Sequence, residues 1–131
     1  MTAKGYPNSK FNALRGEFTA AEQELMNSKA TEYAGEFDRL ENFHQLGAIQ
    51  GMAPMDITLT LMLKHVLSIC KAVNTLNINW SWTSADGKEG LKQRIADMRN
   101  YGLLLAACID EYVEKSQEAR HMQDKGPRGV Y

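Results

Sequence analysis

Residues 55–76, MDITLTLMLKHVLSICKAVNTL, carry the strongest helical pattern in the chain. Apolar side chains recur there at helical spacing and cover much of the circumference, which is typical of a helix with neighbours on several sides. They are Ile57, Leu61, Val66, Ile69 and Val73. Pro54 just before them suits a first helical turn, whose N–H groups have no partner within the helix. The pattern predicts a central helix over residues 55–76.

Two capping-box patterns lie before this helix. Thr19 followed by Glu22 predicts a helix over residues 20–33, because the hydroxyl and the carboxylate can accept hydrogen bonds from free N–H groups at a helix start. Asp38 followed by Glu41 predicts a second, shorter helix ahead of the central one.

A long pattern after the central helix predicts a fourth helix. Residues 77–87 are rich in Asn, Ser, Asp and Gly and are expected to form a loop, with the helix following over residues 88–119. Its apolar stripe stays close to the 3.6-residue period of a helix. The stripe comprises Leu91, Ile95, Met98, Gly102, Leu105, Ile109 and Val113.

These elements predict an all-α fold, a compact bundle of four main helices. Residues 1–18 are expected to form an N-terminal arm that packs on the domain or on a neighbouring subunit. Residues 19–119 are expected to form the helical domain, and residues 120–131 a loose, flexible C-terminal tail. The 131 residues suit a single domain with one core.

Composition and charge narrow the possible functions. The formal net charge is −1, so no global basic field favours direct nucleic-acid binding, and an anionic ligand requires a local cluster. Cys70 and Cys108 lie in apolar helical patterns, where a free thiol packs as a small hydrophobic group, and a reducing cytoplasm is expected. Neither a signal peptide nor a run of about 18 apolar residues is found, so no membrane partner is expected.

Polar residues occur where the two longest helices should be driest. Lys64, Ser68 and Lys71 recur at i, i+4 and i+7 on the central helix, with His65 beside them. The last helix carries a matching line, made of Gln93, Asp97 and Asn100, with Arg94 and Tyr101 adjacent. Burying polar groups without partners costs free energy, so these two lines face solvent, satisfy one another or surround a ligand.

Two interpretations of the polar lines stay open. The first is a solvated face with an ion pair of the Lys64–Asp97 type. The second is a ligand site in which cationic side chains contact phosphate while Asn100 and Tyr101 contact a base or sugar. Those cationic side chains are Lys64, His65 and Arg94.

The segment between the first two predicted helices is dense in charge. Its carboxylates Glu32, Glu36 and Asp38 are candidate ligands for a hydrated magnesium ion, which prefers a few carboxylates together with water and phosphate oxygens. Arg39 is a candidate phosphate ligand. The alternative is a solvated turn with two capping carboxylates.

Other candidates give weaker signals. Trp80 and Trp82 either stack on a base or, as we expect, close one end of the bundle. His44 and His121 have no partner at metal-ligand spacing and are expected to be ordinary surface residues. The sequence contains no Gly-rich phosphate loop, no HExxH motif and no recognisable nucleophile–base pair, so no catalytic residue is assigned.

Four short motifs occur in order between residues 28 and 112. They are Lys29-x-x-x-Tyr33-Ala34, Asp38-Arg39-Leu40-x-Asn42-Phe43, Met62-x-Lys64-His65-x-x-Ser68-Ile69 and Asp97-x-x-Asn100-Tyr101. This order resembles small all-α proteins of phages and prophages, the nucleotide-modification-associated helical domains. More distantly, it resembles the MazG-like nucleoside triphosphate pyrophosphohydrolases.

The resemblance implies a homo-oligomer in the host-cell cytoplasm that binds nucleotide phosphates or a magnesium-bound pyrophosphate. By position it implies a pocket built from both polar lines, with a rim ahead of the second helix. The pocket residues are Lys64, Asp97, Asn100 and Tyr101, and the rim residues are Arg39 and Asn42. Asp97 then joins Glu32, Glu36 and Asp38 as a candidate magnesium ligand.

One position departs from this family pattern. Gln93 stands where the family has a glutamate four residues before the aspartate. A glutamine supplies no charge and cannot act as a base, whereas MazG-like hydrolysis needs carboxylates that hold magnesium and activate water. Nucleotide binding is therefore easier to retain here than hydrolysis.

Two functions are expected from these features. The first is a phage nucleotide-binding protein that captures a nucleotide or cyclic nucleotide without cleaving it, as in counter-defence against the host. The alternative is a magnesium-dependent, MazG-like pyrophosphohydrolase of nucleotide metabolism or modification. A third interpretation is an interaction protein whose polar lines only specify the register of its helices.

Overall fold

The computed structural model describes the backbone of residues 5–33 and 38–125, and their side chains except at residues 28–33 and 123–125. Four helices occur in these ranges: α1 (Asn8–Tyr33), α2 (Glu41–Gln50), α3 (Pro54–Asn74) and α4 (Leu91–Lys125). The described ranges contain no strand, only an isolated bridge between Thr83 and Glu89. The all-α prediction is confirmed.

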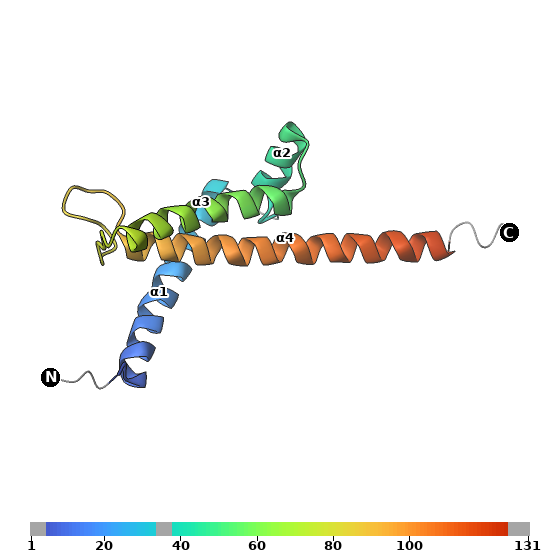
Figure 1. The fold of residues 1–131 in the computed structure, drawn as a ribbon. Coiled ribbons are helices and arrows are strands. Elements are labelled where there is room, and N and C mark those ends of the chain that lie inside the picture. The colour runs from blue at the N-terminus through green and yellow to red at the C-terminus, as the bar shows by residue number, and fades with distance from the viewer. Residues whose placement is uncertain (1–4, 34–37, 126–131) are drawn as a thin grey trace.

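The centre of the fold is the pair formed by α3 and α4, which lie side by side and run antiparallel (Figure 1). Helix α2 packs on the start of α3 after a bend of 100°, and α1 crosses α4 near its N-terminal half (Figure 1). The C-terminal half of α4 extends well beyond the other helices (Figure 1). The arrangement is thus more open than the compact bundle that the sequence predicts.

Helix α3 agrees closely with its predicted bounds of 55–76. Pro54 occupies its first turn, as its fixed φ angle and missing N–H allow. The end is set by Thr75, whose N–H bonds to the carbonyl of Lys71, and by Leu76, which adopts a positive φ of 55°. Unlike a fully central helix, however, α3 is covered on only part of its circumference, because Val73 is 51% exposed.

The predicted N-terminal arm is wrong in part, because residues 8–18 belong to α1. Thr19 does not cap a helix start: its hydroxyl donates to the carbonyl of Arg15 one turn earlier, at 2.8 Å. The helix begins twelve residues sooner because Phe18, only 4% exposed, packs against Trp82 in the loop between α3 and α4, and this contact holds that part of the helix to the fold.

The last helix is longer than predicted at its C-terminal end. Residues 120–125, expected to belong to the loose tail, are helical, and α4 starts at Leu91 rather than at residue 88. The added turns are rich in good helix formers such as Gln, Arg and Lys, and the first helix breaker is Gly126. The rest of the predicted tail, residues 126–131, lies outside the described residues.

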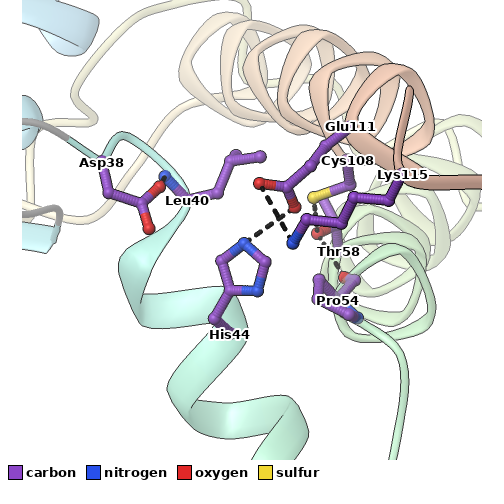
Figure 2. Close-up of polar contacts among 8 residues, drawn as sticks. All are labelled: Asp38, Leu40, His44, Pro54, Thr58, Cys108, Glu111 and Lys115. Atoms are coloured by element: carbon purple, nitrogen blue, oxygen red, sulfur yellow. Dashed lines mark hydrogen bonds and ion pairs between the residues drawn. The ribbon is translucent and has the colours of Figure 1, made fainter. Parts of the chain in front are cut away.

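The main core lies where α2, α3 and α4 meet. Its buried members are Leu40, Phe43, Ile57 and Cys108, with Met55, Leu61, Tyr101, Leu104 and Ala107 packed against them. Within it, the hydroxyl of Thr58 donates to the carbonyl of Pro54 and lies 3.4 Å from the sulfur of Cys108 (Figure 2). This buried contact fixes how the start of α3 sits on the middle of α4.

In the described part of the chain, no single helix is long and apolar enough to cross a membrane. Helices α2 and α3 taken together pass on length and composition, but they bend by 100° at the break between them.

Candidate ligand-binding site

A cavity of about 390 Å³ lies between the α3–α4 pair and the ends of α1 and α2. Its wall is largely apolar: Leu25 and Met26 from α1, Phe43 and Leu46 from α2, Leu61 from α3, and Leu104 from α4. Its polar lining consists of Arg39, Asn42, His65, Glu89, Asp97, Asn100 and Tyr101. An apolar wall with a few converging polar groups is the usual composition of a small-molecule site, and the volume falls in the usual range of about 300–1,000 Å³.

The structure brings together most of the side chains that the sequence predicts as ligand-binding. Those that line the cavity are Arg39, Asn42, His65, Asp97, Asn100 and Tyr101. They come from α3, α4 and the start of α2, so folding is needed to assemble them. The apolar wall is the part that the sequence did not predict, because its residues are indistinguishable there from ordinary core residues.

Asn100 is the most unusual residue of the cavity. It is only 6% exposed, and its side-chain nitrogen Nδ2 has no hydrogen-bond partner in the part of the chain that the structure describes. A buried donor without a partner costs on the order of 1–3 kcal/mol. Because Asn100 also lines the cavity, this donor lies in the cavity wall, where neighbouring atoms cover it.

An aromatic pair forms the α3 side of the cavity. The rings of His65 and Tyr101 are stacked, with 5.3 Å between their centroids and 25° between their planes. This contact ties α3 to α4 and explains why two polar aromatic residues lie between helices. It also gives the cavity a π-rich edge next to the Asn100 amide.

Arg39 and Asp97 carry opposite charges and both line the cavity, but each bonds to a different neighbour. Arg39 donates through Nη1 to the carbonyl oxygen of Met26, 3.1 Å away, and so links the start of α2 to α1. Asp97 accepts a hydrogen bond of 3.0 Å from Nε2 of Gln93, one turn earlier on α4. Gln93 thus holds the Asp97 carboxylate in place instead of adding a second charge.

Five residues in or beside the predicted polar lines do not line the cavity: Lys64, Ser68, Lys71, Gln93 and Arg94. Ser68 and Arg94 bond to each other, with 2.5 Å between Oγ and Nη1, and line a neighbouring open hollow of about 780 Å³ together with Lys71. Lys64, predicted as a phosphate ligand, is exposed and lines neither space. The Lys64–Asp97 ion pair is absent from the described residues.

The predicted magnesium ligands are not seen together. Glu36 and the side chain of Glu32 lie outside the described residues. Asp38 accepts a hydrogen bond of 2.9 Å from the N–H of Leu40 at the start of α2. Among the side chains that the structure describes, no group of three or more His, Cys, Asp or Glu residues could hold a metal ion. A magnesium site at Asp97 stays a prediction.

Trp80 and Trp82 lie against Phe18 of α1 and do not line the cavity. The ring of Trp82 lies 5.0 Å from that of Phe18, and its Nε1 donates to the carboxylate of Glu17 at 2.7 Å. Lys92 donates to the same carboxylate at 2.8 Å, and these hydrogen bonds from Lys92 and Trp82 lower the pKa of Glu17 below its usual value. For Trp82, the structure thus favours the predicted packing role.

His44, expected to be an ordinary surface residue, has a partner that the sequence did not reveal. Its Nε2 lies 2.8 Å from a carboxylate oxygen of Glu111 on α4, and Lys115 reaches the other oxygen at 3.9 Å (Figure 2). The pair links α2 to α4 next to the Thr58–Cys108 contact (Figure 2). Sequence periodicity could not find it, because 67 residues separate the partners.

Comparisons of the chain with protein-family models, with characterised proteins and with solved structures gave no match. The resemblance to phage helical domains therefore stays an expectation, and the function must be argued from the cavity itself.

Proposed function

We propose that the cavity binds a nucleotide that carries few negative charges, such as a nucleoside monophosphate or a cyclic mononucleotide, without cleaving it. The observation that carries this proposal is the buried Nδ2 of Asn100, which has no partner among the described residues and lies in the wall of a cavity that combines apolar and polar side chains. A nucleobase matches such a space because it combines a flat apolar face with hydrogen-bond acceptors at its edge.

Each part of the ligand has a matching group in the lining. The base packs against the apolar wall beside the His65–Tyr101 pair, and its edge accepts from the Asn100 amide. The phosphate lies at the rim, where Arg39 is exposed and keeps donors beyond the one that it gives to Met26. The sugar hydroxyls donate to Asp97.

The balance of charge disfavours a triphosphate, because every added negative charge must be offset by the lining. Among the lining residues that the structure describes, Arg39 is the only lysine or arginine, while Asp97 and Glu89 contribute two carboxylates. A triphosphate needs more positive charge or a metal ion to offset its own. Hydrolysis of triphosphates remains the alternative, and it depends on a metal site that includes Glu32 and Glu36.

Calorimetry with a panel of nucleosides, nucleoside monophosphates, cyclic mononucleotides and triphosphates tests the proposal. We expect a monophosphate or cyclic mononucleotide to bind with a Kd below about 10 µM. Asn100→Asp replaces the donor by an acceptor at nearly constant volume and should weaken that binding by about tenfold or more. Asn74→Asp, the same change at an exposed position of α3, is the matched control and should leave binding unchanged.

A second variant locates the phosphate. Arg39→Gln should weaken binding of the nucleotide and leave the weaker binding of the parent nucleoside unchanged, because only the nucleotide reaches the rim. Failure of every compound to bind, or equal affinities of Asn100→Asp and the wild type, contradicts the proposal. Release of pyrophosphate from triphosphates with magnesium supports the hydrolase alternative instead.

A further inference from the structure

The side of α3 that faces away from the cavity is apolar and uncovered. Leu59, Leu63, Val66, Cys70 and Val73 recur there at i, i+4, i+7, i+11 and i+14, which places them in one row along the helix. The row contains no charged residue, yet Leu63 and Val73 are each 51% exposed. A helix row of this composition is normally buried against another element.

Helix α4 carries a second row of the same kind. Gly102, Ala106, Ile109 and Val113 recur at i, i+4, i+7 and i+11, again without a charged residue. Ile109 and Val113 are each 43% exposed. Gly102 and Ala106 have small side chains and leave a shallow depression in the surface, whereas Ile109 and Val113 are branched and project from it.

The two rows lie on the same side of the helix pair. The sulfur of Met62 would be 3.8 Å from a Cβ atom at Gly102, and Met62 adjoins Leu59 and Val66 on the surface of α3. By contrast, the cavity is lined by Leu61 on α3 and Leu104 on α4. The rows therefore join into a single apolar surface, here called the open face, opposite the cavity.

The exposed area is large for a chain of this size. A compact monomer of 14.7 kDa exposes about 6,900 Å², whereas this chain exposes 9871 Å². A standard interface needs only about 800 Å² from each partner. The uncovered side of α3 and α4 is one source of this excess, and the protruding C-terminal half of α4 is another.

We propose that the open face is covered by a second copy of this chain. A twofold axis that sets α3 of one copy on α4 of the other brings the bulky row around Leu63 onto the low surface at Gly102 and Ala106, and does so twice. The result is a core of four helices. This surface is separate from the cavity, so the dimer stands whether or not the proposed function is right.

Sedimentation equilibrium of the full chain measures the assembly directly. We expect a mass of twice 14.7 kDa. Leu63→Glu and Ala106→Glu, one on each row, should each weaken association by about 100-fold or more, because they bury a charge without a partner. Leu103→Glu is the matched control, because Leu103 is 63% exposed on α4 but lies outside both rows, and it should stay dimeric.

Thiol labelling gives a second measurement that does not rely on a disruptive variant. Cys70 lies within the α3 row and is exposed in the single chain. Its reaction with a maleimide should slow as protein concentration rises in the wild type, and stay at the monomer rate in Leu63→Glu. Helix content by circular dichroism verifies that each variant is folded.

The proposal is overturned by a monomeric wild type at about 100 µM, far above the Kd of a stable dimer. It is also overturned if Leu103→Glu dissociates the dimer while both row variants leave it intact. A monomer that co-sediments with lipid vesicles, or whose Cys70 is protected only by another protein, would assign the open face to that occupant instead.

Discussion

The two faces of the α3–α4 pair make opposite use of polar and apolar side chains. On the cavity face, polar residues such as Asn100 are buried beneath the shorter helices. On the open face, leucine and valine side chains are left in contact with solvent. Folding alone would favour the reverse distribution, because burying a polar group costs free energy and burying an apolar one gains it.

This inversion teaches that both faces are shaped for something other than the folding of a single chain. The two proposals account for both faces: a ligand satisfies the buried donor of the cavity face, and a second copy covers the apolar surface of the open face. Changes on the cavity face should therefore alter folding and ligand binding, whereas changes on the open face should alter assembly. Five predictions test this difference, from the largest effect to the smallest.

The largest effect is expected at Phe43, which anchors α2 on the cavity face. Phe43 is 9% exposed and belongs to the core cluster with Leu40 and Ile57. Phe43→Ala should reduce the free energy of unfolding by about 3–5 kcal/mol, measured by urea denaturation. Ile49→Ala on the same helix is the control, because Ile49 is 81% exposed and should change stability by less than about 0.5 kcal/mol. Equal losses in the two variants would show that α2 is not anchored through this face.

The two cysteines report on the two faces separately. Cys70 is exposed on the open face, whereas burial raises the pKa of the Cys108 thiol and the Thr58 hydroxyl offsets this only in part. In the monomeric Leu63→Glu variant, Cys70 should react with a thiol reagent faster than Cys108 by a factor on the order of 100. Cys70→Ser in that background should remove the fast phase alone. Equal rates would show that the core around Cys108 is open.

The raised pKa of Cys108 also fixes a direction for stability against pH. The folded state favours the neutral Cys108 thiol. The contribution of this thiol to the free energy of unfolding is therefore complete below the pKa of the unfolded thiol, about 8.5. It is lost as pH rises above that value, because the unfolded chain ionises first. Cys108→Ala should therefore lose less stability than the wild type between neutral pH and mildly alkaline pH.

Much of the fold could be predicted because α2 and α3 carry local signals. The proline at the start of α3 and its apolar spacing act within a few residues. The start of α1 was missed because a local pattern misled: Thr19 and Glu22 match a capping box, yet the helix continues through them. What holds the earlier turns is the contact of Phe18 with Trp82, which lies far along the chain.

The candidate site could be predicted only as far as helix spacing reaches. Spacing placed Asp97, Asn100 and Tyr101 together on α4, and the structure lines the cavity with all three. It could not tell that Lys64, one residue from His65, faces away from the cavity. That distinction depends on the rotation of α3 against α4, which packing at Thr58 and Cys108 sets. The sequence could not predict the exposure of the open face either, because its apolar residues recur at the same helical spacing as buried core residues.

Two glycines, one at the corner between α2 and α3 and one on the open face, give a comparison with a smaller effect. A Cβ atom at Gly47 would lie 2.4 Å from the backbone oxygen of Met52, at the corner between α2 and α3. Gly47→Ala should cost about 1–3 kcal/mol, because backbone must move. At Gly102 on the open face, the nearest atom would be the sulfur of Met62 at 3.8 Å, an ordinary contact. Gly102→Ala in the Leu63→Glu background should therefore gain up to about 1 kcal/mol from helix propensity.

Thermal unfolding of both glycine variants gives the sign of each change. A loss at Gly102 as large as that at Gly47 would mean that the seam between α3 and α4 is packed more tightly than these distances indicate. The open face would then be as tightly packed at Gly102 as the corner between α2 and α3 is at Gly47.

The smallest effect is expected from the ion pair between His44 and Glu111, which also links α2 to α4 (Figure 2). The two side chains are 31% and 29% exposed, so solvent screens much of their attraction. A double-mutant cycle with His44→Gln and Glu111→Gln should give a coupling below about 1 kcal/mol, and Lys115→Gln should have less effect still. If the coupling instead approached the loss in Phe43→Ala, α2 would be held by charge rather than by apolar burial.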